Sequence, residues 1–100
     1  MRKLKGAHRH DILQMFDGNA LVGIELGVAA GEFSARMVAS GRFAEFFGVD
    51  MYGDTHDTAQ YKTALRRVGL FEAYKLLRMS FDEAYDLFDD ESLDCLLYTS

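Results

Sequence analysis

Apolar residues along this 100-residue chain occur in short continuous runs that alternate with segments of helical spacing. A continuous apolar run of about four to eight residues is typical of a strand buried on both faces of a parallel sheet. Such runs predict strands at residues 21–26, 46–50, 74–78 and 93–98. The chain shows no internal repeat, low-complexity segment or linker between them.

The segments between the strands carry the periodicity of amphipathic helices. The clearest helix is predicted at residues 58–68, where apolar side chains recur at i, i+3, i+4 and i+7: Tyr61, Ala64, Leu65 and Val68. Further helices are predicted at residues 11–16, 33–40 and 81–88. Strands that alternate with helices predict a mostly parallel sheet with right-handed crossovers.

The predicted fold class is therefore α/β, a Rossmann-like three-layer sandwich around a sheet of about four strands. Numbered along the chain, the strands take the order 3-2-1-4, with strand 21–26 in a central position. In such sheets a ligand lies beyond the carboxyl ends of the strands, where the strand order reverses. The loop after residue 26 and residues 98–100 are expected to flank that point. Residues 1–100 are expected to form one domain.

The segment from Leu21 to Gly31, Leu-Val-Gly-Ile-Glu-Leu-Gly-Val-Ala-Ala-Gly, predicts a strand, a tight loop and the start of a helix. This unit presents backbone N–H groups to a ligand at a helix N-terminus. A dinucleotide fingerprint has the form G-x-G-x-x-G, whose middle glycine lets the backbone approach a pyrophosphate. Because the middle position is Ala29, a nicotinamide dinucleotide is the weaker alternative.

Two carboxylates at strand ends favour S-adenosylmethionine as the ligand. Glu25 stands just before the loop, where an unpaired carboxylate repels a pyrophosphate but suits a ligand with an ammonium and a sulfonium group. Asp50 ends the neighbouring strand, about 4.8 Å away across the sheet. Its carboxylate can accept charge-assisted hydrogen bonds from both ribose hydroxyls. Met51 follows it and can pack its thioether against an adenine ring.

On these residues the chain resembles the N-terminal half of class I S-adenosylmethionine-dependent methyltransferases. The segment from Glu25 to Gly31 matches that family's acidic-x-Gly-x-x-x-Gly loop, and Asp50 matches its ribose-binding acid. The segment Arg78-Met-Ser-Phe-Asp-Glu-Ala84, before a Ser-Leu-Asp strand, is similar to small-molecule O-methyltransferases of the catechol-type and macrolide-sugar branch. The resemblance covers roughly residues 20–98.

The resemblance implies a set of cofactor-binding residues. It assigns the methionine part of the ligand to Glu25, Gly27, Ala29 and Gly31, the ribose to Asp50, and the adenine border to Met51, Met79 and Ser80. Gly27 and Gly31 also suit backbone geometry alone, at positive φ and at a close helix–sheet contact respectively. For Ser80 the sequence also offers a capping box with Glu83, the interpretation that the Ser-x-x-Glu spacing favours.

The resemblance implies methyl transfer to an oxygen or nitrogen of a small molecule that the sequence does not identify. The chain departs from the family, whose sheet has seven strands, so we expect a fold that is truncated after residue 100. Whether it is an enzyme depends on that missing part. No catalytic base can be assigned; Tyr98 is the one side chain nominated near the methyl group.

The composition of the chain bears on nucleic-acid binding, on membrane insertion and on the cellular compartment. The net charge is −5 and the cations beyond the first nine residues are scattered, which argues against binding of nucleic acid. No apolar stretch approaches the roughly 20 residues that cross a bilayer. The single cysteine, Cys95, fits a reducing compartment, so we expect a cytoplasmic protein. The basic N-terminus is expected to be a solvated tail.

Two further hypotheses follow from local features. The segment Gly53-Asp54-Thr55-His56-Asp57 offers metal-binding side chains, but no further ligand arrives at a recognisable spacing, so a turn and a helix cap are favoured and no metal is expected. A catalytically silent interaction module is the alternative function. An exposed edge of strand 93–98 would recruit another chain or a second copy, because unpaired apolar edges attract partner strands.

Overall fold

The computed structural model describes residues 2–5, 18–53, 57–88 and 93–98. Its elements follow in the order β1 (Arg2–Lys5), β2 (Leu21–Leu26), α1 (Glu32–Ala39), β3 (Phe43–Val49), α2 (Asp57–Ala64), the π-helical segment η2 (Leu65–Gly69), β4 (Tyr74–Leu77), α3 (Phe81–Leu87) and β5 (Cys95–Tyr98). The predicted helix at residues 11–16 lies outside the described residues.

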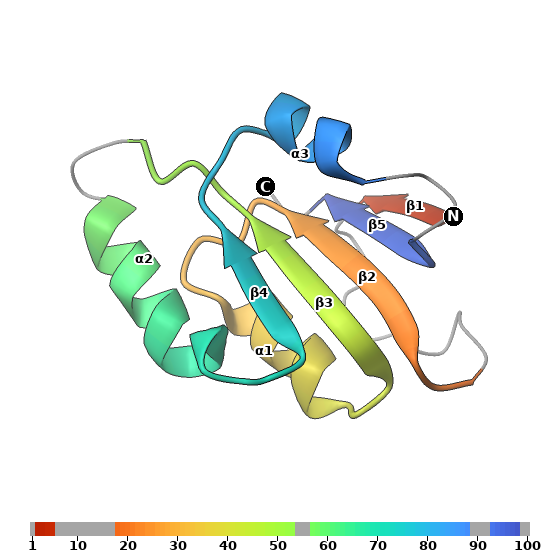
Figure 1. Ribbon diagram of the computed structural model, residues 1–100. Helices are drawn as coiled ribbons and strands as arrows, with labels where there is room; N and C mark the ends of the chain where they lie inside the picture. Colours follow the sequence, from red (N-terminus) through yellow and green to blue (C-terminus); the bar gives the residue numbers. More distant parts are fainter. Residues whose placement is uncertain (1, 6–17, 54–56, 89–92, 99–100) are drawn as a thin grey trace.

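The strands form one open parallel sheet with the order β1-β5-β2-β3-β4 (Figure 1). β2, β3 and β4 adjoin one another in chain order, and β5 pairs with the other edge of β2. The predicted α/β class with a parallel sheet is confirmed. The predicted number of about four strands is corrected to five, because β1 pairs with β5 along Arg2–Lys5. The four predicted strands, now β2 to β5, have the neighbours that the predicted order 3-2-1-4 gives them.

The sequence analysis did not predict β1, because three of its four residues are charged and the segment lacks an apolar run. The expected solvated tail is therefore wrong for Arg2–Lys5. An edge strand can carry such a pattern, since one edge has no neighbouring strand and charged side chains there deter aggregation. The pairing of β1 also covers the edge of β5 on which the interaction-module hypothesis depended.

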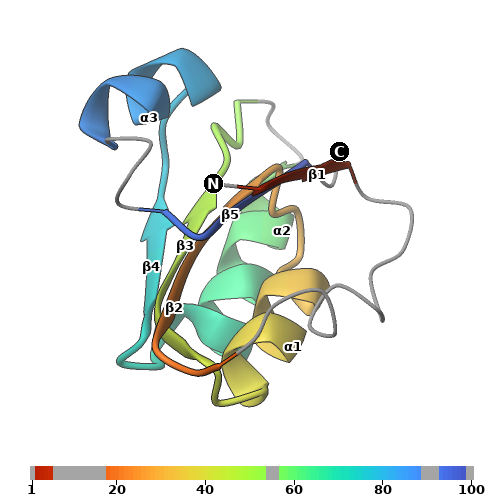
Figure 2. The same cartoon turned by 90° about the vertical axis from the view of Figure 1, so that its right-hand side faces the viewer.

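Helices cover both faces of the sheet: α1 and α2 lie on one face, and α3 lies on the other (Figure 2). The core on the α1 side contains Leu21, Phe33, Met37, Phe43, Phe46, Val68 and Tyr74. The core on the α3 side contains Ile24, Leu26, Val49, Ala84, Leu93 and Leu96. A chain of this size thus divides its apolar side chains between two layers, which explains the continuous apolar runs along the strands.

The helix predicted at residues 58–68 is present as α2 followed by η2. Ala64 and Val68 are fully buried, while Leu65, which belongs to the same apolar spacing, is 38% exposed. The Ser80–Glu83 capping box is confirmed: each side chain accepts a hydrogen bond from the other residue's backbone N–H at 3.1 Å. No helix within the described residues is long and apolar enough to cross a membrane.

Candidate functional site

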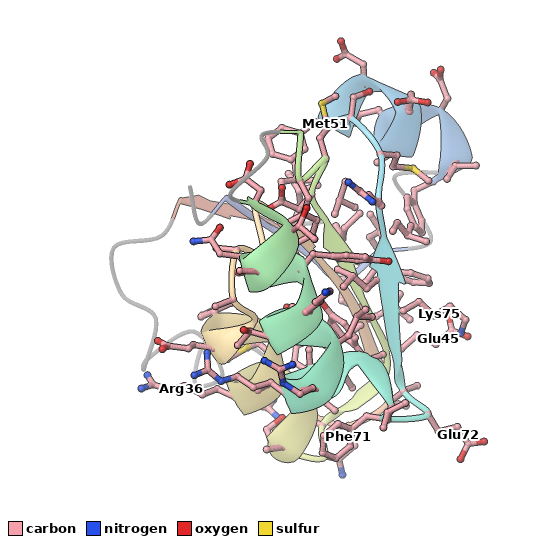
Figure 3. All side chains as sticks on the ribbon, turned by 90° about the vertical axis from the view of Figure 1, so that its left-hand side faces the viewer. Arg36, Glu45, Met51, Phe71, Glu72 and Lys75 are labelled. Carbon is pink, nitrogen blue, oxygen red and sulfur yellow. The ribbon has the colours of Figure 1, made fainter. Side chains whose placement is uncertain are left out.

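An open cavity of about 220 Å³ lies at the carboxyl ends of β2 and β3, and Gly27, Asp50, Met51 and Phe81 line it. Figure 3 shows Met51 near α3, at the end of the sheet where β3 finishes. Parallel strands bring their carboxyl ends to one edge, so residues that follow β2 and β3 meet there although they are far apart in sequence. Three of the eight residues predicted from the sequence line this cavity.

The Asp50 carboxylate holds the loop that follows β2. Its Oδ2 accepts hydrogen bonds from the backbone N–H groups of Val28 at 3.1 Å and Ala29 at 3.0 Å. Its Oδ1 accepts one from the N–H of Tyr52 at 3.0 Å. A carboxylate offers about four lone-pair sites. Asp50 therefore retains limited capacity for further donors while it holds the loop.

Both glycines of the loop have positive φ, as the sequence analysis expected of Gly27. Gly27 has φ 93°, and its N–H donates to the Val49 carbonyl at 2.8 Å. Gly31 has φ 85° at the N-cap of α1. A Cβ on Gly31 would lie 3.1 Å from the Ala64 Cα, tighter than most real contacts. Gly31 therefore permits close packing of the loop against α2, whereas the sequence analysis expected a close helix–sheet contact at this position.

Ala29 occupies the position at which a dinucleotide fingerprint has its middle glycine, and its φ is 52°. Its carbonyl accepts a hydrogen bond from the Tyr52 hydroxyl at 2.6 Å. Tyr52 is 2% exposed, and burial raises the pKa of its phenol, as does the nearby Asp50 carboxylate. The phenol therefore stays protonated and able to donate a hydrogen bond up to a higher pH than an exposed tyrosine.

Glu25 lies under the loop and does not line the described cavity. Its carboxylate is buried at 1% exposure and accepts a hydrogen bond from the Ser34 hydroxyl on α1. Ser34 in turn accepts one from the Tyr74 hydroxyl on β4 at 3.0 Å. The prediction that Glu25 presents an unpaired carboxylate to a ligand is corrected. The side chain alternates with Ile24 and Leu26, which pack on the α3 side, so it points into the α1 layer.

Met79 and Ser80, which the resemblance placed beside adenine, take other positions. Met79 packs against the core on the α3 side, and Ser80 caps α3. Neither residue lines the described cavity. Phe81 does so at 37% exposure, and sequence reasoning missed it. The available signal was a large aromatic residue directly after the helix-capping Ser80.

Arg78 was also missed, and it anchors the segment after β3. Its guanidinium donates to the carbonyl of Met51 at 3.2 Å and to that of Tyr52 at 3.1 Å. The same group lies 5.1 Å from the ring centroid of Tyr61 on α2. One wall of the cavity is thereby tied to both β4 and α2.

Part of the Gly53–Asp57 segment, residues 54–56, lies outside the described residues, so the structure does not test that segment as a metal turn. Among the residues that the structure does describe, no group of three or more His, Cys, Asp and Glu side chains could hold a metal ion. Tyr98 belongs to β5, where its backbone pairs with Leu26 of β2, and its side chain lies outside the part of the chain that the structure describes.

Neither a family model nor a curated protein matches the chain.

Proposed function

We propose that the chain binds S-adenosylmethionine at the carboxyl edge of β2 and β3 and uses it to methylate an oxygen or nitrogen of a small molecule. The observation that carries the proposal is the cavity lined by Gly27, Asp50 and Met51. The same proposal includes the fold: we regard the sheet as Rossmann-like and as part of a methyltransferase fold.

The walls of the cavity suit a nucleoside. Met51 and Phe81 are exposed by 58% and 37%, and a thioether and an aromatic ring are favourable partners for the faces of adenine. The lone-pair capacity that Asp50 retains supplies an acceptor for a ribose hydroxyl. At about 220 Å³ the cavity is smaller than the roughly 300 Å³ at which ligand sites usually begin. We therefore assign it to the nucleoside and place the methionine part along the loop.

The loop suits the remaining part of the ligand. The N-terminus of α1 follows Gly31 directly, and a helix N-terminus favours the negative charge of a carboxylate. In this proposal Glu25 acts beneath the loop through Ser34 and does not contact the ligand.

When bound, the cofactor supplies a methyl group already activated by a sulfonium. The residues of the site therefore need to orient the ligand and exclude water, and covalent catalysis is unnecessary. Gly27 and Asp50 orient the ligand from two strand ends, and Phe81 shields one side of the cavity. The single cysteine supports the further proposal of a reducing, cytoplasmic location.

The alternative function, a silent module that recruits a partner through an exposed edge of β5, is disfavoured because β1 pairs with that edge. The nicotinamide alternative is disfavoured by Ala29, and it becomes the control ligand. We expect S-adenosylhomocysteine to raise the melting temperature and NAD to leave it unchanged. Ligand at about 100 times its Kd adds about 2.7 kcal/mol to the free energy of unfolding. For a domain of this size the expected rise is on the order of 10 °C.

Two variants make the test specific. Met51→Glu places a carboxylate on the adenine wall, and since Met51 is 58% exposed it should cost little stability. We expect it to weaken S-adenosylhomocysteine by at least about tenfold, or 1.4 kcal/mol. Leu70→Glu is the matched control, because Leu70 is 92% exposed and does not line the cavity. A cooperative melt that S-adenosylhomocysteine does not move, or equal affinities for the two variants, would refute the proposal.

A further inference from the structure

Ala29 is held through both of its backbone polar atoms by one segment, residues 50–52. Its N–H donates to Asp50 Oδ2 at 3.0 Å, and its carbonyl accepts from the Tyr52 hydroxyl at 2.6 Å. Rotation about the Ala29 backbone therefore breaks both hydrogen bonds. The two bonds define a clasp between the loop after β2 and the segment after β3.

The clasp maintains a backbone conformation that alanine disfavours. Ala29 has φ 52°, in the left-handed region, where a Cβ clashes with the following carbonyl and glycine is favoured. Within the described residues, three non-glycine residues have positive φ: Ala20, Ala29 and Tyr52. The clasp joins two of the three directly. Such conformations persist where the surrounding structure determines them, and they concentrate at ligand sites.

Tyr52 is well supported as the holding group. Its N–H donates to Asp50 Oδ1 at 3.0 Å, and its carbonyl accepts from Arg78 at 3.1 Å. Its ring packs against that of Tyr61, with centroids 4.9 Å apart, and the residue is 2% exposed. The hydroxyl is therefore fixed in place, and the loop is the partner that would move if the bond were lost.

We propose that Tyr52 is a positioning residue, whose hydroxyl fixes Ala29 in the left-handed conformation and so shapes the loop for the methionine part of the ligand. The hydroxyl thereby provides the restraint that makes alanine tolerable at a position suited to glycine. This inference rests on the proposed function for its ligand, while the clasp itself is a property of the free protein.

Tyr52→Phe tests the role, because phenylalanine keeps the ring and the N–H donor to Asp50 and removes the bond to Ala29. We expect its affinity for S-adenosylhomocysteine to fall about threefold to tenfold, the range for one hydrogen bond. 5′-Methylthioadenosine has the nucleoside and lacks the amino-acid part, so its affinity should change less than about twofold. Isothermal titration calorimetry measures both, and Tyr85→Phe, on exposed α3, is the matched control.

Rescue provides a second readout that a general loss of stability would not give. In the Tyr52→Phe background, Ala29→Gly should restore most of the affinity for S-adenosylhomocysteine, since glycine adopts the left-handed conformation without restraint. Equal losses for the two ligands in Tyr52→Phe, or no rescue by glycine, would overturn the positioning role.

Amide hydrogen exchange of the ligand-free protein tests the clasp without any ligand. Although Ala29 is exposed, its N–H should be protected in the wild type and exchange faster in Tyr52→Phe. If the wild type does not bind S-adenosylhomocysteine but its Ala29 amide is protected, the proposed function fails and the clasp stands. Fast exchange at Ala29 in the wild type overturns the clasp, and this measurement holds even if Tyr52→Phe does not fold.

Discussion

Ser34 is the residue whose replacement should most clearly separate stability from ligand binding. It joins two buried groups, donating to the Glu25 carboxylate and accepting from the Tyr74 hydroxyl. All three residues are less than about 5% exposed. Ser34→Ala removes only one oxygen atom, so it changes the hydrogen bonds with little change in packing.

The expected magnitude follows from the two bonds. A hydrogen bond to a charged group is worth about 1.5–3 kcal/mol, and a neutral one about 0.5–1.5 kcal/mol. Ser34→Ala should therefore lower the free energy of unfolding by about 2–4 kcal/mol. For a domain of this length that corresponds to a fall in Tm on the order of 10–20 °C. Thermal and urea unfolding followed by circular dichroism measure both quantities.

A double-mutant cycle with Tyr74→Phe tests the connection itself. Alone, Tyr74→Phe should cost about 1 kcal/mol, and in the Ser34→Ala background it should cost close to nothing, because the acceptor is already gone. Ser40→Ala is the control at the C-cap of the same helix, since the partly buried Ser40 hydroxyl donates to the Met37 carbonyl and accepts from the Arg42 N–H, both of them local partners. Additive costs in the cycle, or a Ser34→Ala protein within about 0.5 kcal/mol of the wild type, would refute the buried connection.

Two further predictions concern the same layer. Gly48→Ala places a Cβ in overlap with the Tyr74 hydroxyl and a Val28 methyl, and overpacking of this kind costs about 1–3 kcal/mol. Gly53→Ala, whose Cβ would meet nothing within 4 Å, should leave Tm almost unchanged, and equal melting of the two variants would contradict the packing. Burial raises the pKa of Tyr52 and of Tyr74 above the ordinary value of 10.0. At pH values below 10.0 the phenols are neutral, and their full contribution to the stability of the folded protein is present. Above pH 10.0 the phenols ionise first in the unfolded state, so the free energy of unfolding falls as pH rises through the folded-state pKa. Unfolding free energies measured from pH 8 to about 11 should therefore fall less in Tyr74→Phe than in the wild type.

The sequence pattern predicts those parts of the fold that depend on local signals. β2 is apolar nearly throughout because helices cover both faces of the sheet, and glycine bounds α1 and η2 at Gly31 and Gly69. Because β2 and β3 pair in parallel, Gly27 and Asp50 lie at the same edge of the sheet, and this can be predicted without side-chain contacts. β1 gives no such signal, because a charged edge strand lacks the apolar pattern by which the other strands are recognised.

The direction of the Glu25 side chain is beyond that kind of prediction. An apolar run buried on both faces does not show which face an acidic residue within it will meet. Its partner is Ser34, nine residues later in α1, and the pair becomes evident only when α1 packs on the sheet. Tyr52 was missed for a similar reason: its hydroxyl acts on the Ala29 carbonyl, which belongs to another loop.

The position of Asp50 at a strand end can be predicted from the sequence, but its hydrogen bonds in the ligand-free protein cannot be predicted in this way. In the structure its carboxylate accepts three backbone N–H groups, two of them from the loop after β2. A ribose would have to use the remaining lone pair or displace one of these donors. The Tyr52 hydroxyl holds the Ala29 carbonyl through a separate hydrogen bond, so one loop N–H can leave Asp50 while that bond maintains the loop conformation. Loop shape and ribose binding thus need not compete for the same carboxylate, provided that the Tyr52 hydroxyl is present.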